Sequence, residues 1–140
     1  MIDHDLARRI RARGLPDSVV TIATRGGASL HPALGYRAGQ VEPRPDGPAW
    51  AVVAASGRDD LVPLWTRGTV TVLSAGDGTF LEWDAEEGEP WTVWPDFACV
   101  VRSLMTDLWE DEADEQDRAE VARLLLPEGL VAEALVPQER

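Results

Sequence analysis

The stretch from Trp50 to Glu110 constrains the fold most, because short apolar segments separated by turns lead directly into an amphipathic helix pattern. The segments cover residues 50–55, 61–65, 69–73 and 80–83. Short apolar or β-branched runs bounded by Gly, Asp and Ser are typical of strands, and Gly76-Asp77-Gly78 suits the positive φ angles of a tight hairpin. The pattern predicts an antiparallel meander.

A helix is expected after the meander, from about residue 97. Apolar residues recur there every three or four positions and form one stripe, and Asp96 suits the N-cap. The stripe consists of Phe97, Val100, Val101, Leu104, Met105 and Leu108. In the strand before it, Phe80 and Leu81 point to opposite faces, so both faces of the sheet need a cover. The helix is expected to dock on the sheet.

The segments before the meander are less regular. Residues 5–13 predict a short amphipathic helix that ends at Gly14. For residues 16–25 the sequence allows either a helix or a strand. The Pro-Asp-Ser start favours a helix, whereas the β-branched run favours a strand. Residues 29–48 are rich in Pro and Gly and predict an irregular loop.

After the meander, a further helix is expected over about 114–126, with Val121, Leu124 and Leu125 facing inward, and a weaker turn over 130–135. We predict one α+β domain over residues 1–140, built from a twisted antiparallel sheet with flanking helices. An acidic helical C-terminal extension is expected from about residue 111 to 140.

The chain shows no sign of export or of a membrane span. Cys99 is the single cysteine, so an internal disulfide is impossible, and the N-terminus lacks the apolar run of a secretion signal. No run of about 18 apolar residues occurs anywhere. We therefore expect a cytoplasmic protein without a membrane partner.

Charge is distributed unevenly along the chain, whose formal net charge is −12. Residues 1–70 carry nine Arg against seven acids, a sum of +2, whereas residues 71–140 carry four Arg against eighteen acids, a sum of −14. Nucleic-acid binding depends on cationic side chains that displace counterions, so nucleic acid is an unfavourable partner. A basic protein would be attracted, although acidity also simply confers solubility.

Signatures of catalysis and of cofactor binding are missing from the sequence. His4 and His31 have no second His or Cys at ligand spacing, which argues against a transition-metal site. Cys99 lies opposite the apolar stripe in acidic surroundings that do not favour a thiolate. No nucleophile elbow or phosphate-binding loop occurs. We therefore predict no catalytic residue, no metal and no cofactor.

Acidic residues and tryptophans gather in the second half of the chain. Interface hot spots combine such aromatic residues with a charged rim, although core packing is the default role of any one tryptophan. A second acidic cluster, around residues 110–120, is interpreted as a solvated helix junction. The predicted partner-binding residues are Glu82, Trp83, Asp84, Glu86, Glu87, Glu89, Trp91, Trp94 and Trp109.

From Trp50 onward the chain resembles the SUKH superfamily, a group of bacterial immunity proteins that also includes a fungal cell-wall-assembly regulator domain. The resemblance rests on the segment 50–54 leading to Gly57 and Asp60, the strand 61–65, the hairpin to Phe80-Leu81-Glu82-Trp83-Asp84 and the helix near Phe97; Leu15-Pro16 and Gly26-Gly27 add to it. It covers about 90 residues and includes no catalytic signature. It implies an α+β domain that neutralises a cognate toxin by binding it.

The expected function is therefore that of a non-catalytic immunity-type protein, whose acidic, tryptophan-bearing face binds a basic toxin domain. One alternative is an intracellular regulatory or scaffolding module for protein interaction. Another is a carboxylate-dependent hydrolase, which would need a cleft with two acids within reach of one another. The sequence leaves the identity of the partner and the oligomeric state open.

Overall fold

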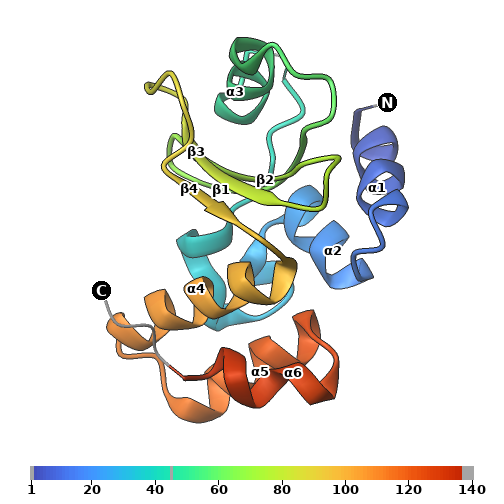
Figure 1. Ribbon diagram of the computed structural model, residues 1–140. Helices are drawn as coiled ribbons and strands as arrows, with labels where there is room; N and C mark the ends of the chain where they lie inside the picture. The colour runs from blue at the N-terminus through green and yellow to red at the C-terminus, as the bar shows by residue number, and fades with distance from the viewer. Residues whose placement is uncertain (1, 45, 137–140) are drawn as a thin grey trace.

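The computed structural model describes residues 2–44 and 46–136, which form an α+β domain with 52% helix and 15% strand. In this part of the chain, four strands form an open antiparallel sheet in the order β1-β2-β3-β4 (Figure 1). The strands are β1 (Val62–Arg67), β2 (Val70–Ser74), β3 (Phe80–Asp84) and β4 (Thr92–Trp94). The predicted α+β meander is therefore confirmed.

Helices precede and follow the sheet. Those before it are α1 (Ile2–Ala12), α2 (Asp17–Arg25), the 3-10 segments η1 (Gly27–Ser29) and η2 (Pro32–Ala38), and α3 (Pro48–Ser56). Those after it are α4 (Phe97–Glu110), α5 (Glu115–Leu125) and α6 (Glu128–Ala134). In Figure 1, α3 lies on one side of the sheet, and α4, α5 and α6 lie on the other.

Both faces of the sheet are covered, as the alternation in β3 predicts. Phe80 belongs to the larger apolar core, where Phe97 of α4 contacts it with ring centroids 5.6 Å apart. Leu81 and Trp83 belong to a second core under α3, together with Val52. The meander is thus a central layer between α3 and the larger helical layer, and α4 docks on it as expected.

The expectation of a strand at residues 50–55 is wrong, because this segment belongs to helix α3. Pro48 occupies the first turn, where a missing N–H is harmless, and Gly57 ends the helix with φ 69°. The Ala residues between them favour a helix. Two adjacent valines made the run look like a strand, but Val52 is buried while Ala51 and Ala54 are exposed.

The open question over residues 16–25 is answered by helix α2. Its buried side chains, Val19, Val20, Ile22 and Ala23, follow helical spacing, and Gly26 ends it with φ 92°. The predicted loop over 29–48 is partly wrong, because η2 forms within it. Leu34 and Ala38 anchor η2 by being fully buried.

The region after the sheet follows the prediction closely. Asp96 caps α4 by accepting a hydrogen bond from the N–H of Cys99 at 2.9 Å. Helices α5 and α6 contribute Val121 and Val131 to the larger core. Leu124 departs from its expected inward position, because it is 42% exposed. None of the helices within the described ranges combines the length and the apolar character needed to cross a lipid bilayer.

Candidate functional site

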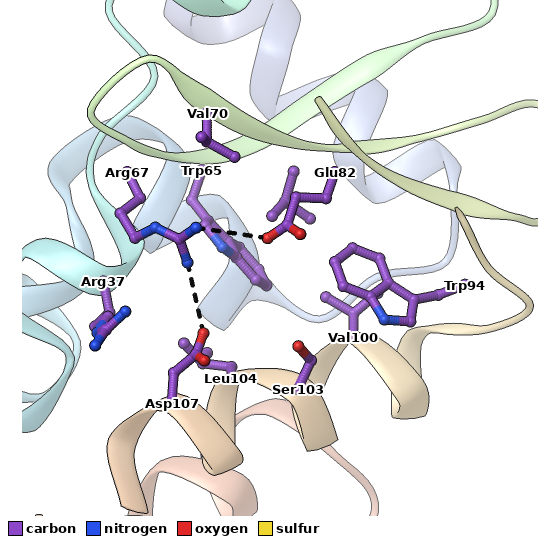
Figure 2. Close-up of a pocket in the computed structure, with 11 residues that line it drawn as sticks. Arg37, Trp65, Arg67, Val70, Glu82, Trp94, Val100, Ser103, Leu104 and Asp107 are labelled. Carbon is purple, nitrogen blue, oxygen red and sulfur yellow. Dashed lines mark ion pairs between the residues drawn. The ribbon is translucent and has the colours of Figure 1, made fainter. Parts of the chain in front are cut away.

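A polar cleft of about 430 Å³ lies between the sheet and α4. Four elements build it, because its lining comes from η2, the end of β1, the β3–β4 region and the outer side of α4. The lining residues are Arg37, Arg67, Glu82, Trp91, Thr92, Trp94, Ser103, Asp107 and Glu110. Figure 2 shows the inner part of this region, with the side chains of both sheet and helix pointing into it.

Arg67 lies at the centre of the cleft, between two carboxylates (Figure 2). Its guanidinium nitrogens are 3.8 Å from Glu82 Oε2 and 3.5 Å from Asp107 Oδ2. Both distances exceed the 2.7–3.2 Å typical of N–H to O hydrogen bonds. These are loose ion pairs. The side chains are partly covered, with exposed fractions of 30% for Arg67, 18% for Glu82 and 14% for Asp107.

The backbone explains how these groups converge. Arg67 is the last residue of β1 and precedes the turn at Gly68, which has φ 62°. Glu82 pairs with Thr92 across β3 and β4, and its carboxylate accepts a hydrogen bond from the Thr92 hydroxyl at 3.3 Å. Asp107 projects from α4. The three charged groups at the centre of the cleft are thus carried by regular elements rather than by loops.

A second arginine at the cleft is held much more tightly. Arg37 donates two hydrogen bonds of 2.6 Å to Asp111, which raise the pKa of Arg37 above its usual value and lower that of Asp111. This bidentate geometry is the strongest that a guanidinium and a carboxylate can form. Arg37 therefore fixes η2 to the end of α4, whereas Arg67 is held more loosely.

The structure divides the predicted binding residues by exposure. Four of them are exposed and lie in the β3–β4 connection, namely Glu86, Glu87, Glu89 and Trp91. We call these four residues the acidic rim. Figure 1 shows that the β3–β4 connection projects beyond the sheet. The three carboxylates make no hydrogen bond or ion pair with any residue that the structure describes. Trp91 is 53% exposed and also lines the cleft.

Two predicted binding residues are largely buried. Trp83 is 6% exposed and donates a hydrogen bond from its indole to the carbonyl of Glu87 at 2.9 Å. Trp94 is 8% exposed and packs in the larger core, with one edge at the cleft. Their burial leaves almost no surface for a partner, so their main role is packing.

The remaining predicted residues lie apart from the acidic rim or serve its backbone. Trp109 is 50% exposed, but it follows Asp107 by two residues and so points about 160° away from it around α4. Asp84 accepts hydrogen bonds from the Glu86 N–H and the Thr69 hydroxyl, which fixes the start of the β3–β4 loop. Sequence reasoning did not identify Arg67 or Asp107, whose convergence depends on packing between sheet and helix.

The cleft does contain the pair of acids that the hydrolase alternative requires. Glu82 and Asp107 face the same space, but each has an oxygen directed at the same guanidinium. A general acid or base must be within hydrogen-bond reach of the group it serves, and here Arg67 stands between the two acids. The arrangement is better suited to binding a charged group than to moving protons.

His31, Asp117 and Glu120 form the one group in the described part of the chain that has three metal-type ligands within 4.8 Å. However, His31 Nδ1 accepts a hydrogen bond from the N–H of Ala33 at 3.1 Å, so the neutral ring carries its proton on Nε2. That nitrogen lies 3.4 Å from Glu120 Oε2 and donates to it. The ring therefore links η2 to α5 by hydrogen bonds, and coordination of a metal through Nε2 would cost the hydrogen bond from Ala33, because it requires the proton on Nδ1. The side chain of His4 lies outside the described part.

An apolar groove of about 710 Å³ lies on another side, between the α1–α2 turn, the start of α4 and the α5–α6 junction. Leu124 and Leu130 are its most exposed apolar walls. Cys99 lines a smaller adjoining hollow, where burial and a hydrogen bond with Asp96 raise the pKa of the thiol. This thiol is poorly suited to act as a nucleophile.

Taken together, these elements form an α+β domain with a charged cleft edged by tryptophan side chains. No protein-family model, curated protein or solved structure matches the chain. The SUKH resemblance thus stays a prediction from the sequence pattern.

Proposed function

We propose that this protein is a cytoplasmic, non-catalytic binding protein of the immunity type, which neutralises a basic toxin domain by binding it with the acidic rim. The supporting observation is that three exposed glutamates stand beside a half-exposed tryptophan and make no hydrogen bond or ion pair within the described residues. Because these three carboxylates have no partner among the described residues, they are available to bind another protein.

The electrostatics of the surrounding chain support a cationic partner. Residues 71–101 carry seven carboxylates and no Arg, Lys or His. A surface of one sign attracts an oppositely charged protein over several ångströms and accelerates its association, an effect that salt weakens. Trp91 offers the large aromatic contact that dominates the energy of many interfaces.

The experiment uses the full chain as immobilised bait in extract of the native cell, at low and high salt, followed by purification of the captured protein. The variant Glu86→Gln, Glu87→Gln, Glu89→Gln should bind that protein about tenfold or more weakly, with less salt dependence. The matched control Asp59→Asn, Glu115→Gln, Glu128→Gln removes the same charge from exposed positions elsewhere and should bind normally.

Neutralisation is tested by growth. Cells that express the captured protein should stop growing, and co-expression of the chain should restore growth, whereas the rim variant should restore it less well. Growth that is unaffected by the captured protein would contradict the toxin assignment and favour the regulatory or scaffolding alternative. Equal binding by the rim variant and the wild type would show that the surface is wrong.

A further inference from the structure

We propose that the cleft between the sheet and α4 receives an arginine side chain of the partner, whose guanidinium replaces Arg67 between Glu82 and Asp107. The inference rests on the proposed function, since it names the chemistry by which the same partner is recognised. It adds a specific guanidinium-binding site, formed by Glu82 and Asp107 and called the socket below, to the general attraction exerted by the acidic rim.

The first argument is that the cleft already holds a guanidinium, but holds it poorly. Arg67 lies 3.5 Å and 3.8 Å from its carboxylates, whereas Arg37 reaches Asp111 at 2.6 Å with both of its bonds. A guanidinium and a carboxylate gain most from direct, paired hydrogen bonds. Glu82 and Asp107 can therefore exchange Arg67 for an arginine that approaches with better geometry.

The second argument is that Arg67 can leave without disturbing the fold. It stands at the end of β1 next to the Gly68 turn, and its side chain is 30% exposed. No hydrogen bond from its guanidinium to a described residue holds it in place. Rotation of the long side chain moves its charge toward solvent, where it costs little.

The third argument concerns the walls of the cleft. Trp91 borders it as a half-exposed aromatic ring, and a planar guanidinium stacks on an aromatic ring better than the ammonium of lysine does. The other arginine that lines the cleft, Arg37, is paired with Asp111 through two hydrogen bonds. A volume of about 430 Å³ is ample for one side chain. Charge and shape together favour arginine over lysine and over any anion.

The test uses small probes rather than the partner itself. N-acetyl-arginine amide is titrated into the protein, and the indole N–H signals of the six tryptophans are followed by NMR, with the Trp91 signal assigned from Trp91→Phe. Saturable shifts of the Trp91 and Trp94 signals are expected with this probe. N-acetyl-citrulline amide, a neutral analogue of the same shape, should produce none, and N-acetyl-lysine amide should bind more weakly.

Arg67→Gln provides the sharpest variant, because removal of the internal competitor should strengthen binding of the arginine probe several-fold. If Arg67 has only a structural role, Arg67→Gln should bind the arginine probe more weakly than the wild type or equally well. Glu82→Gln with Asp107→Asn should abolish the shifts while the tryptophan signals stay dispersed, which reports an intact fold. Shifts that are equal for arginine and citrulline, or that persist in this double variant, would overturn the proposal.

The same double variant separates the two proposals. Undiminished capture of the partner by Glu82→Gln with Asp107→Asn, together with loss in the rim variant, would overturn the socket and leave the proposed function standing. Saturable arginine binding in a protein that captures no basic partner would support the socket and contradict the proposed function.

Discussion

At the scale of single residues, the tryptophans show how one residue type takes on different roles in this molecule. Trp83 and Trp65 are buried on opposite sides of the sheet, whereas Trp91 and Trp109 are about half exposed. The indole N–H of Trp83 is satisfied by the carbonyl of Glu87, so the buried ring also fixes the loop that carries the acidic rim. Packing of this ring thereby positions the surface charges.

Trp83→Ala should lower the free energy of unfolding by about 3–5 kcal/mol, because it empties the core under α3 and leaves the Glu87 carbonyl without its donor. Trp109→Ala is the matched control, since the same truncation at a 50% exposed site should cost less than about 1 kcal/mol. Both values come from urea denaturation. Similar losses for the two variants would contradict the assignment of Trp83 to the core.

The sequence could predict the composition of this region but not the exposure of each ring. Alternation correctly placed Trp83 on the Leu81 face of β3, yet whether that face was open depended on α3, which looked like a strand. Trp94 lies on a strand of three residues between two prolines, too short for a recognisable pattern. Arg67 and Asp107 are forty residues apart, and only packing brings them together.

At the scale of elements, segments whose apolar pattern repeats over many residues could be predicted from the sequence, whereas short segments without such a repeat could not. Helix α4 extends over 14 residues and is capped by Asp96, and β1, β2 and β3 are separated by turns at Gly68 and Gly78. The 3-10 segment η2 has no period of that kind, and it is held by distant contacts. His31 caps it at one end through Ala33 and ties it to α5 through Glu120.

Loss of the His31 link should loosen η2 but should not reveal a lost metal. His31→Ala is expected to lower the free energy of unfolding by about 1 kcal/mol, the usual cost of losing a cap. Added Zn²⁺ should leave the melting temperature of the wild type unchanged. A rise of the melting temperature with Zn²⁺ that disappears in Glu120→Gln would show instead that the three side chains bind a metal.

Asp60 joins the α3–β1 turn to the β2–β3 turn, and its contribution should depend on pH. It accepts hydrogen bonds from the Arg58 guanidinium at 2.7 Å and 2.8 Å and from the Gly76 N–H at 2.9 Å. These partners, Arg58 first, hold the pKa of Asp60 well below its usual range. A depressed pKa stabilises the fold above the unfolded-state value of about 3.9 and ceases to do so as pH falls toward the folded-state value.

Asp60→Ala should therefore cost about 1 kcal/mol at neutral pH, a modest value because the pair is partly exposed, and the difference from wild type should shrink below about pH 4. Asp59→Ala removes an exposed neighbouring carboxylate and should change stability by less than about 0.5 kcal/mol. Urea denaturation across a pH series measures both. A cost for Asp60→Ala that does not change with pH would rule out the ionised link.

At the scale of the whole molecule, the net charge of −12 repels itself, and this works against the compact state. Part of the negative charge still has a structural use. Glu115 and Glu128 lie in the first turns of α5 and α6, where a carboxylate interacts favourably with the helix dipole. The acidic rim has no such partner among the described residues, so its charges should oppose folding rather than support it.

The rim variant Glu86→Gln, Glu87→Gln, Glu89→Gln should therefore be as stable as the wild type or more stable, by up to about 1 kcal/mol at low ionic strength, and salt should erase the gain. The control Asp59→Asn, Glu115→Gln, Glu128→Gln should be slightly less stable, because two of its charges are removed from helix starts. Thermal unfolding at two salt concentrations distinguishes them. A loss of stability in the rim variant would mean that the three glutamates stabilise the fold. A gain would mean that they destabilise it, as expected for charges that serve to bind a partner.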